Sequence, residues 1–340
     1  MVFLNAVRLL LENFKNTYKI MLYQFVVTLV AAALCAAMLL PELSILAESA
    51  PAQQFIEGLK KFFSAFFAVD TAGLTEAKEL ISAALKAFID LLSQRATGVI
   101  LATVGCVVVY LVKRFAETIC YFTIGDVLDD KMNTYGQTPF LPSLVANLGR
   151  GSVYALIYVP ITFLWDVLTV GLVLLIFSVS GVLTALFLSM TVIVVMQALK
   201  LVGTGLWLPA MSADKKTFRE ALHVGTKPER KQRVKMFGTY IEAVYVVVIL
   251  NAVAALCTFG SALMITVPAS YFLFICLQYV YYYTVQGRKY FISFDRIASN
   301  PDKGDREHIF DYINETHLPQ LAESATEDNE KTKEEVDGQK

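Results

Sequence analysis

The sequence predicts an all-α integral membrane protein, in which six membrane-spanning helices form a bundle and two amphipathic helices lie outside the cytoplasm. Of its 340 residues, 56% are hydrophobic and 17% are charged, whereas an average soluble domain has roughly a quarter charged residues. Long uncharged runs alternate with short charged segments. Several of these runs reach the ~20 apolar residues that a bilayer-spanning helix needs.

The first predicted span covers residues 20–40. Its uncharged, mostly apolar run of 21 residues is longer than the hydrophobic part of a signal peptide, which has about 7–15 residues. Arg8, Lys15 and Lys19 precede it. We therefore expect a retained helix that starts on the cytoplasmic side.

Two amphipathic helices are predicted over residues 52–68 and 75–92, because apolar side chains recur there at helical spacing. We expect Thr75 to cap the second one. Two interpretations stay open. The pair can pack on the outer bundle surface or lie in the lipid interface, or it can form a cap that binds a partner or gates a substrate. The apolar side chains of the first helix are Phe55, Ile56, Leu59, Phe62, Phe63, Phe66 and Phe67.

The other five spans are one single helix and two hairpins. Residues 151–199 carry one charge, Asp166, and residues 240–286 carry one charge, Glu242. Each stretch is too long for one span and has a turn signal at its middle. The predicted spans are 93–112, 154–177, 181–200, 240–258 and 262–284.

Lys and Arg residues predict the orientation, because they concentrate in cytoplasmic segments. There are three in residues 1–19 and nine in residues 200–238, and the two hairpin turns have none. We expect a multi-pass protein of the cell (plasma) membrane with both termini in the cytoplasm. Residues 291–340 would form a cytoplasmic tail, disordered from about residue 320 because it is acidic and has few apolar side chains.

Three short segments recur ahead of membrane runs, at residues 3–6, 140–144 and 218–222. Each predicts a short surface helix that leads into a pair of spans, which suggests a threefold repeat over residues 1–290. In this pattern the chain resembles bacterial integral membrane proteins of unknown function that are built from repeated helix hairpins. The resemblance implies a fold and no specific activity.

A candidate intramembrane polar site centres on Asp166, which lies near the middle of the third span and six residues after Pro160. A charged carboxylate at that depth costs ~2.5–3.5 kcal/mol, so it is often functional. Asp166 can be a proton or cation site, a hydrogen-bonded structural residue, or a residue near an interface. Three further polar residues could join it or merely hold helices together. They are Gln197, Asn251 and Gln278.

Several other groups are explained by the membrane. We expect a basic cluster before the fifth span to contact anionic lipid headgroups, at ~1 kcal/mol per residue, and not nucleic acid. Its residues are Lys227, Arg230, Lys231, Arg233 and Lys235. Tyr279, Tyr281, Tyr282 and Tyr283 are typical of an aromatic belt at the inner interface. Asp126, Asp129 and Asp130 would form a solvated helix end.

The sequence contains no recognisable catalytic, nucleotide-binding or metal-binding motif, so we expect no cofactor and no metal. The interpretation we favour is a non-enzymatic inner-membrane scaffold or assembly factor with lipid and membrane-protein partners. The alternative is a secondary transporter or channel that uses Asp166 in the bundle interior.

Overall fold

The computed structural model describes residues 2–68, 70–136, 138–180, 182–226, 228, 230–293, 296–300 and 305–308. Six of the described helices are long and apolar enough to cross a membrane, and this confirms an all-α, multi-pass membrane protein. The chain divides into two compact units, residues 25–116 and residues 1–24 with 117–340. Each unit is described by itself.

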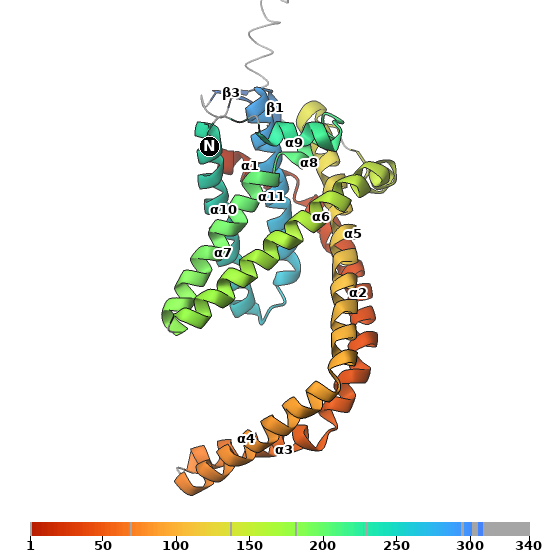
Figure 1. Cartoon of the computed structure of the whole chain (residues 1–340). Coiled ribbons are helices and arrows are strands. Elements are labelled where there is room, and N and C mark those ends of the chain that lie inside the picture. The colour runs from red at the N-terminus through yellow and green to blue at the C-terminus, as the bar shows by residue number, and fades with distance from the viewer. Residues whose placement is uncertain are drawn as a thin grey trace, which may run out of the picture. The chain divides into compact units, whose positions relative to one another are not determined.

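The smaller unit is built from parts of two long helices and a hairpin between them. It contains the end of α2 (Lys15–Ala47), the hairpin of α3 (Ala50–Ala68) and α4 (Thr71–Gln94), and the first part of α5 (Ala96–Thr134). The hairpin bends away from the direction of α2 and α5 (Figure 1).

The helix α4 begins four residues earlier than Thr75, so the prediction that Thr75 caps it is wrong. Asp70 is the capping residue, and its carboxylate accepts a hydrogen bond from the Ala72 amide at 3.1 Å. The Thr75 hydroxyl donates instead to the Thr71 carbonyl within the helix. Both residue types suit the cap position, and the chain uses the earlier one.

The larger unit contains the other helices in a chain of neighbours (Figure 1). Helix α6 packs on α7, α7 on α10, α10 on α11, and α11 on α1. These helices are α1 (Val2–Glu12), α6 (Phe140–Val179), α7 (Val182–Thr204), α8 (Trp207–Ser212), α9 (Phe218–Thr226), α10 (Arg230–Thr258) and α11 (Leu263–Gln286).

The core of the larger unit surrounds α11. In the most apolar stretch of α11, 56% of the residues are buried, against 11% in α10. Every residue of the short helix α8 is buried too. The second part of α5 completes the core with Phe122, Ile124 and Leu128. The larger unit is thus tightly packed around α11, while α6 and α10 leave most of their apolar surface uncovered.

A three-stranded antiparallel sheet follows α11, and the sequence interpretation did not anticipate it. Gly287 ends the helix with a φ of 66°, a left-handed conformation that favours glycine. The strands β1 (Tyr290–Ser293), β2 (Arg296–Asn300) and β3 (Asp305–His308) then pair in that order. Strand β1 contacts α1. Residues 309–340, which include the part predicted to be disordered, lie outside the described residues.

The predicted threefold repeat is wrong at its second copy. Residues 140–144 form the first turn of the continuous helix α6 and not a separate surface helix. Pro142 lies within that first turn, where its missing amide hydrogen costs little. The first and third copies do fall on separate short helices, α1 and α9.

Candidate functional site

Asp166 forms an ion pair, which the sequence interpretation missed. Lys200 of α7 places its Nζ 2.7 Å from Asp166 Oδ1, and Gln197 donates to the same oxygen at 3.3 Å. The side chains of Lys200 and Asp166 are only 12% and 28% exposed. Because α6 and α7 form an antiparallel hairpin, residues at similar distances from its turn meet. In the sequence, Lys200 is the first residue of the basic segment 200–238, which hides its place in the span.

The other two predicted polar residues do not share this cluster. The Asn251 amide donates to the Ser270 hydroxyl at 3.0 Å and accepts from the Thr266 hydroxyl at 2.7 Å. These bonds join α10 to α11. Gln278 is buried on α11, close to the backbone of Gly205. Asp166 and Gln197 therefore share the contact between α6 and α7, while Asn251 and Gln278 belong to other contacts.

The tyrosines at the end of α11 do not form an aromatic belt, so that prediction is wrong. Tyr279, Tyr282 and Tyr283 are fully buried. The Tyr283 hydroxyl donates to Asp129 Oδ1 at 2.7 Å, and the Tyr282 hydroxyl donates to Asp214 Oδ2 at 2.5 Å. We name these two pairs the tyrosine core. A buried hydroxyl needs a partner, and the carboxylates of α5 and of the segment after α8 supply it.

The three aspartates on α5 also accept hydrogen bonds from other side chains, so the prediction of a solvated helix end is wrong. Asp129 is buried and also accepts from Asn133 at 3.1 Å. Asp126 accepts from Ser143 at 3.0 Å and from Asn147 at 2.7 Å, which joins α5 to α6. Asp130 accepts from Thr138.

Within the tyrosine core, Asp214 forms ion pairs with two cationic side chains. Lys216 Nζ lies 2.5 Å from one carboxylate oxygen, and an Arg288 guanidinium nitrogen lies 2.8 Å from the other. Burial alone would raise the pKa of Asp214, but the hydrogen bonds from Lys216, Tyr282 and Arg288 outweigh it and lower that pKa. Asp214 thus ties the segment after α8 to the end of α11.

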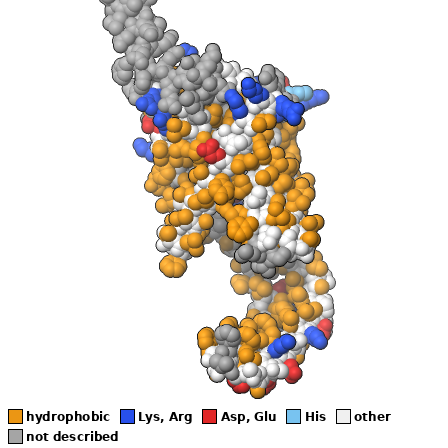
Figure 2. Space-filling view, turned by 90° about the vertical axis from the view of Figure 1, so that its left-hand side faces the viewer, with side chains coloured by type: hydrophobic (Ala, Val, Ile, Leu, Met, Phe, Trp, Pro, Cys, Tyr) orange, Lys and Arg blue, Asp and Glu red, His pale blue; other side chains and the backbone are white. Residues whose placement is uncertain are grey.

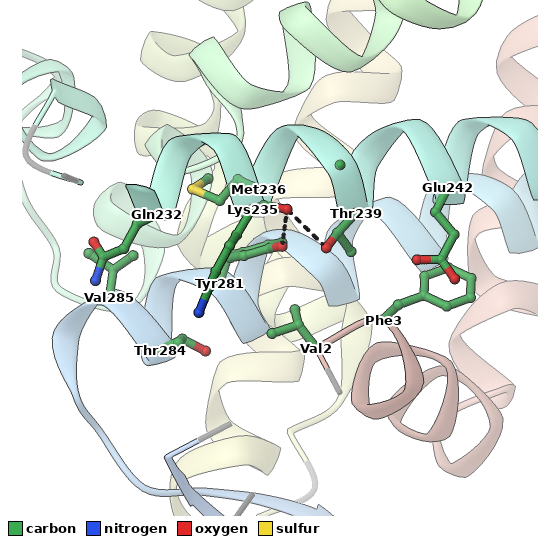
Figure 3. Close-up of a pocket in the computed structure, with 11 residues that line it drawn as sticks. Val2, Phe3, Gln232, Lys235, Met236, Thr239, Glu242, Tyr281, Thr284 and Val285 are labelled. Atoms are coloured by element: carbon green, nitrogen blue, oxygen red, sulfur yellow. Dashed lines mark hydrogen bonds between the residues drawn. The ribbon is translucent and has the colours of Figure 1, made fainter. Parts of the chain in front are cut away.

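A groove of about 580 Å³ lies between α1, α10 and α11 (Figure 3). The Lys235 carbonyl accepts hydrogen bonds from the Tyr281 hydroxyl at 3.2 Å and from the Thr239 hydroxyl at 3.1 Å. Figure 3 shows the Glu242 carboxylate beside the ring of Phe3 at one end. The groove therefore combines apolar side chains with two charged residues, Lys235 and Glu242.

An uncovered apolar strip continues from this groove along α10. Glu242 is exposed, and four apolar residues follow it at spacings of three or four, which places them on one side of the helix. They are between 45% and 80% exposed. On the opposite side, Tyr240, Ala243 and Val244 are buried. We name the strip the open face of α10, and it consists of Glu242, Tyr245, Ile249, Val253 and Leu256.

Four of the five predicted headgroup ligands lie at the start of α10. Arg230, Lys231, Arg233 and Lys235 are exposed there, while Lys227 lies outside the described residues. In Figure 2, Lys and Arg side chains gather at one end of the larger unit and hydrophobic side chains cover the helices below them. This distribution fits a boundary between lipid and water.

Within the described ranges, no group of three or more His, Cys, Asp or Glu side chains could hold a metal ion. No family model, curated protein or solved structure matches the chain. The resemblance to hairpin-built bacterial membrane proteins therefore stays a prediction.

Proposed function

We propose that this protein is a non-enzymatic scaffold or assembly factor of the plasma membrane, and that it binds a partner membrane helix along the open face of α10. The observation that supports this most is the uncovered apolar strip on α10, which carries a carboxylate at its head. Helices in lipid associate through packing and hydrogen bonds across their interface. The open face of α10 offers apolar side chains for packing and the Glu242 carboxylate for a hydrogen bond.

Glu242 favours a protein partner over lipid alone. A carboxylate is expensive next to hydrocarbon unless another group pairs with it. A partner helix with a Lys, Arg or hydrogen-bond donor near its end would meet Glu242 while its apolar part lies on Ile249 and Val253. The groove beside Glu242 gives room for that end.

A photo-crosslinking residue at Ile249 or Val253, in the full chain in native membranes, tests this proposal. We expect adducts with one membrane protein of constant mass, and we expect Glu242→Gln to weaken them. The same probe at Leu164, which is 67% exposed on α6, is the matched control for random neighbours. Lipid adducts alone at Ile249 and Val253 would contradict the proposal.

The orientation and the headgroup contacts belong to the same proposal. Both termini would face the cytoplasm, and Arg230, Lys231, Arg233 and Lys235 would contact anionic headgroups of that leaflet. The support is the Lys and Arg bias of the sequence and the exposure of these four side chains. Protease accessibility of each terminus in sealed, oriented vesicles measures the orientation.

One observation favours a second function, transport or conduction. The pair of Asp166 and Lys200 lies within apolar helices, where paired charges often mark an ion or proton pathway. Substrate or proton flux through liposomes that contain Asp166→Asn would test it. Flux that depends on Asp166 would favour transport, and a protein without flux would leave the pair as a contact between α6 and α7.

A further inference from the structure

The hairpin of α3 and α4 is held together by small side chains. Gly58 and Ala65 of α3 and Ala77 and Ala84 of α4 are all buried. In each helix the two positions are seven residues apart, which is two helical turns on one side. A Cβ added at Gly58 would lie 2.8 Å from the Ile81 side chain, so the two backbones approach closely there.

Leu80 and Ile81 pack against Gly58 in this contact, but several other large apolar side chains of the hairpin point away from it. Phe63 and Phe67 are 55% and 80% exposed. Phe63 lies five residues from Gly58, about 140° around the helix, which turns it away from α4. On α4, Leu85 and Ile89 are exposed as well. Aromatic side chains exposed in this way are costly in water.

The charged side chains take a different side of the hairpin. Lys61 pairs with Glu76 at 3.2 Å across the two helices, and both are exposed. In Figure 2, the hairpin at the bottom of the view has its charges along the lower and right-hand edge, while hydrophobic side chains cover its upper part. The two-helix unit is therefore amphipathic as a whole.

The chain connections fix the hairpin close to the ends of two membrane helices. Only residues 48 and 49 separate α2 from α3, and only Arg95 separates α4 from α5. Glu42 of α2 packs against Gly98 of α5, so these two helices meet next to the hairpin. With both ends tethered this shortly, the hairpin cannot leave the region where α2 and α5 emerge from the membrane.

We infer that the α3–α4 hairpin lies in the membrane–water interface, with Phe63, Phe67, Leu85 and Ile89 among the lipid chains and the Lys61–Glu76 side in water. Residues 50–94 contain four Lys and five Asp or Glu residues, a net charge of 4 − 5 = −1. Burial of apolar surface, and not attraction to anionic lipid, therefore holds the hairpin in place.

The test uses a benzophenone side chain at Phe63 or Phe67 in the full chain, reconstituted in vesicles of phosphatidylcholine alone or with about 30% phosphatidylglycerol. Lys61 is the control position, because it lies two residues from Phe63 and on the other side of the helix. After illumination, mass spectrometry separates lipid adducts from protein adducts. Size-exclusion chromatography verifies that each variant is folded.

We expect about tenfold more lipid adduct at Phe63 and Phe67 than at Lys61, and equal amounts in the two kinds of vesicle. Adducts with a second copy of the chain, or no adduct at either Phe position, would overturn the inference. Lipid adducts that need phosphatidylglycerol would overturn it as well. This result is independent of the α10 probes, so the two proposals can fail separately.

Discussion

The tyrosine core and the α3–α4 hairpin use aromatic side chains in opposite ways. Tyr282 and Tyr283 are buried at the end of α11, and their hydroxyls donate to Asp214 and Asp129. Phe63 and Phe67 are exposed on the hairpin, whose two helices approach each other at buried Gly and Ala residues. The sequence predicts a surface position, on the bundle or at the membrane, for both groups.

The difference follows from the hydroxyl group. A tyrosine can anchor a buried carboxylate, because it brings the donor that the carboxylate needs. A phenylalanine has only apolar surface, so it offers a buried carboxylate no hydrogen-bond donor. The tyrosine core therefore stabilises the folded chain, whereas the hairpin exposes its large apolar side chains.

The largest effect is expected for Tyr283→Phe. It leaves the buried Asp129 carboxylate without its 2.7 Å donor, at a cost of about 2–3 kcal/mol in the free energy of unfolding. Tyr245→Phe is the matched control, because Tyr245 is 51% exposed on α10. Reversible unfolding in mixed micelles measures both. Equal stability of the two variants would mean that the tyrosine core contributes nothing special.

The ion pair on α6 and α7 provides the next contrast. Asp166→Leu or Lys200→Leu leaves one charge unpaired among apolar helices, and each should lower the free energy of unfolding by about 2 kcal/mol. The double variant should recover most of this loss, because it leaves no lone charge. Effects of the single variants that simply add in the double variant would contradict a direct pair.

The hairpin seam is tested by Gly58→Leu. The new side chain would collide with Leu80 and Ile81, and overpacking of this kind costs about 1–3 kcal/mol. We expect faster amide hydrogen exchange in α3 and α4, with exchange in α11 unchanged. Gly149→Leu is the control, since open space surrounds Gly149. Unchanged exchange in Gly58→Leu would show that the two helices are not closely packed.

A smaller and pH-dependent effect is expected for Asp214. Its pKa is lowered from 3.8 in the folded chain, so its contribution to stability is present above that value and is lost as the pH falls through the folded pKa. Asp214→Asn should be less stable than the natural chain at pH 7 by about 1 kcal/mol. The difference should shrink below about pH 4, as thermal unfolding at each pH would show. A difference that is constant with pH would contradict it.

The prediction of a multi-pass membrane protein was possible because it depends only on the length of the apolar runs, which does not change with the way the helices pack. Asp166 and Gln197 stood out because both interrupt otherwise apolar helices, but the sequence left open whether Gln197 joins Asp166 or only holds helices together. Lys200 was missed because lysine is common at the cytoplasmic ends of membrane spans.

The tyrosine core could not be predicted for a related reason. Four tyrosines at the end of a span have the composition of an aromatic belt, and composition does not reveal which side of a helix is covered. Their carboxylate partners Asp129 and Asp214 lie 154 and 68 residues away along the chain. Only the packing of α5 and α8 around α11 brings them together. The strands after Gly287 were missed because their residues lack a strict alternation.

The most direct measurement compares two photo-crosslinking positions in the same native membranes, Val253 on the open face of α10 and Phe67 on the hairpin. We expect Val253 to yield an adduct with a single membrane protein and Phe67 to yield adducts with lipid. An α10 face that crosslinks only to lipid would contradict the proposed role as a scaffold or assembly factor.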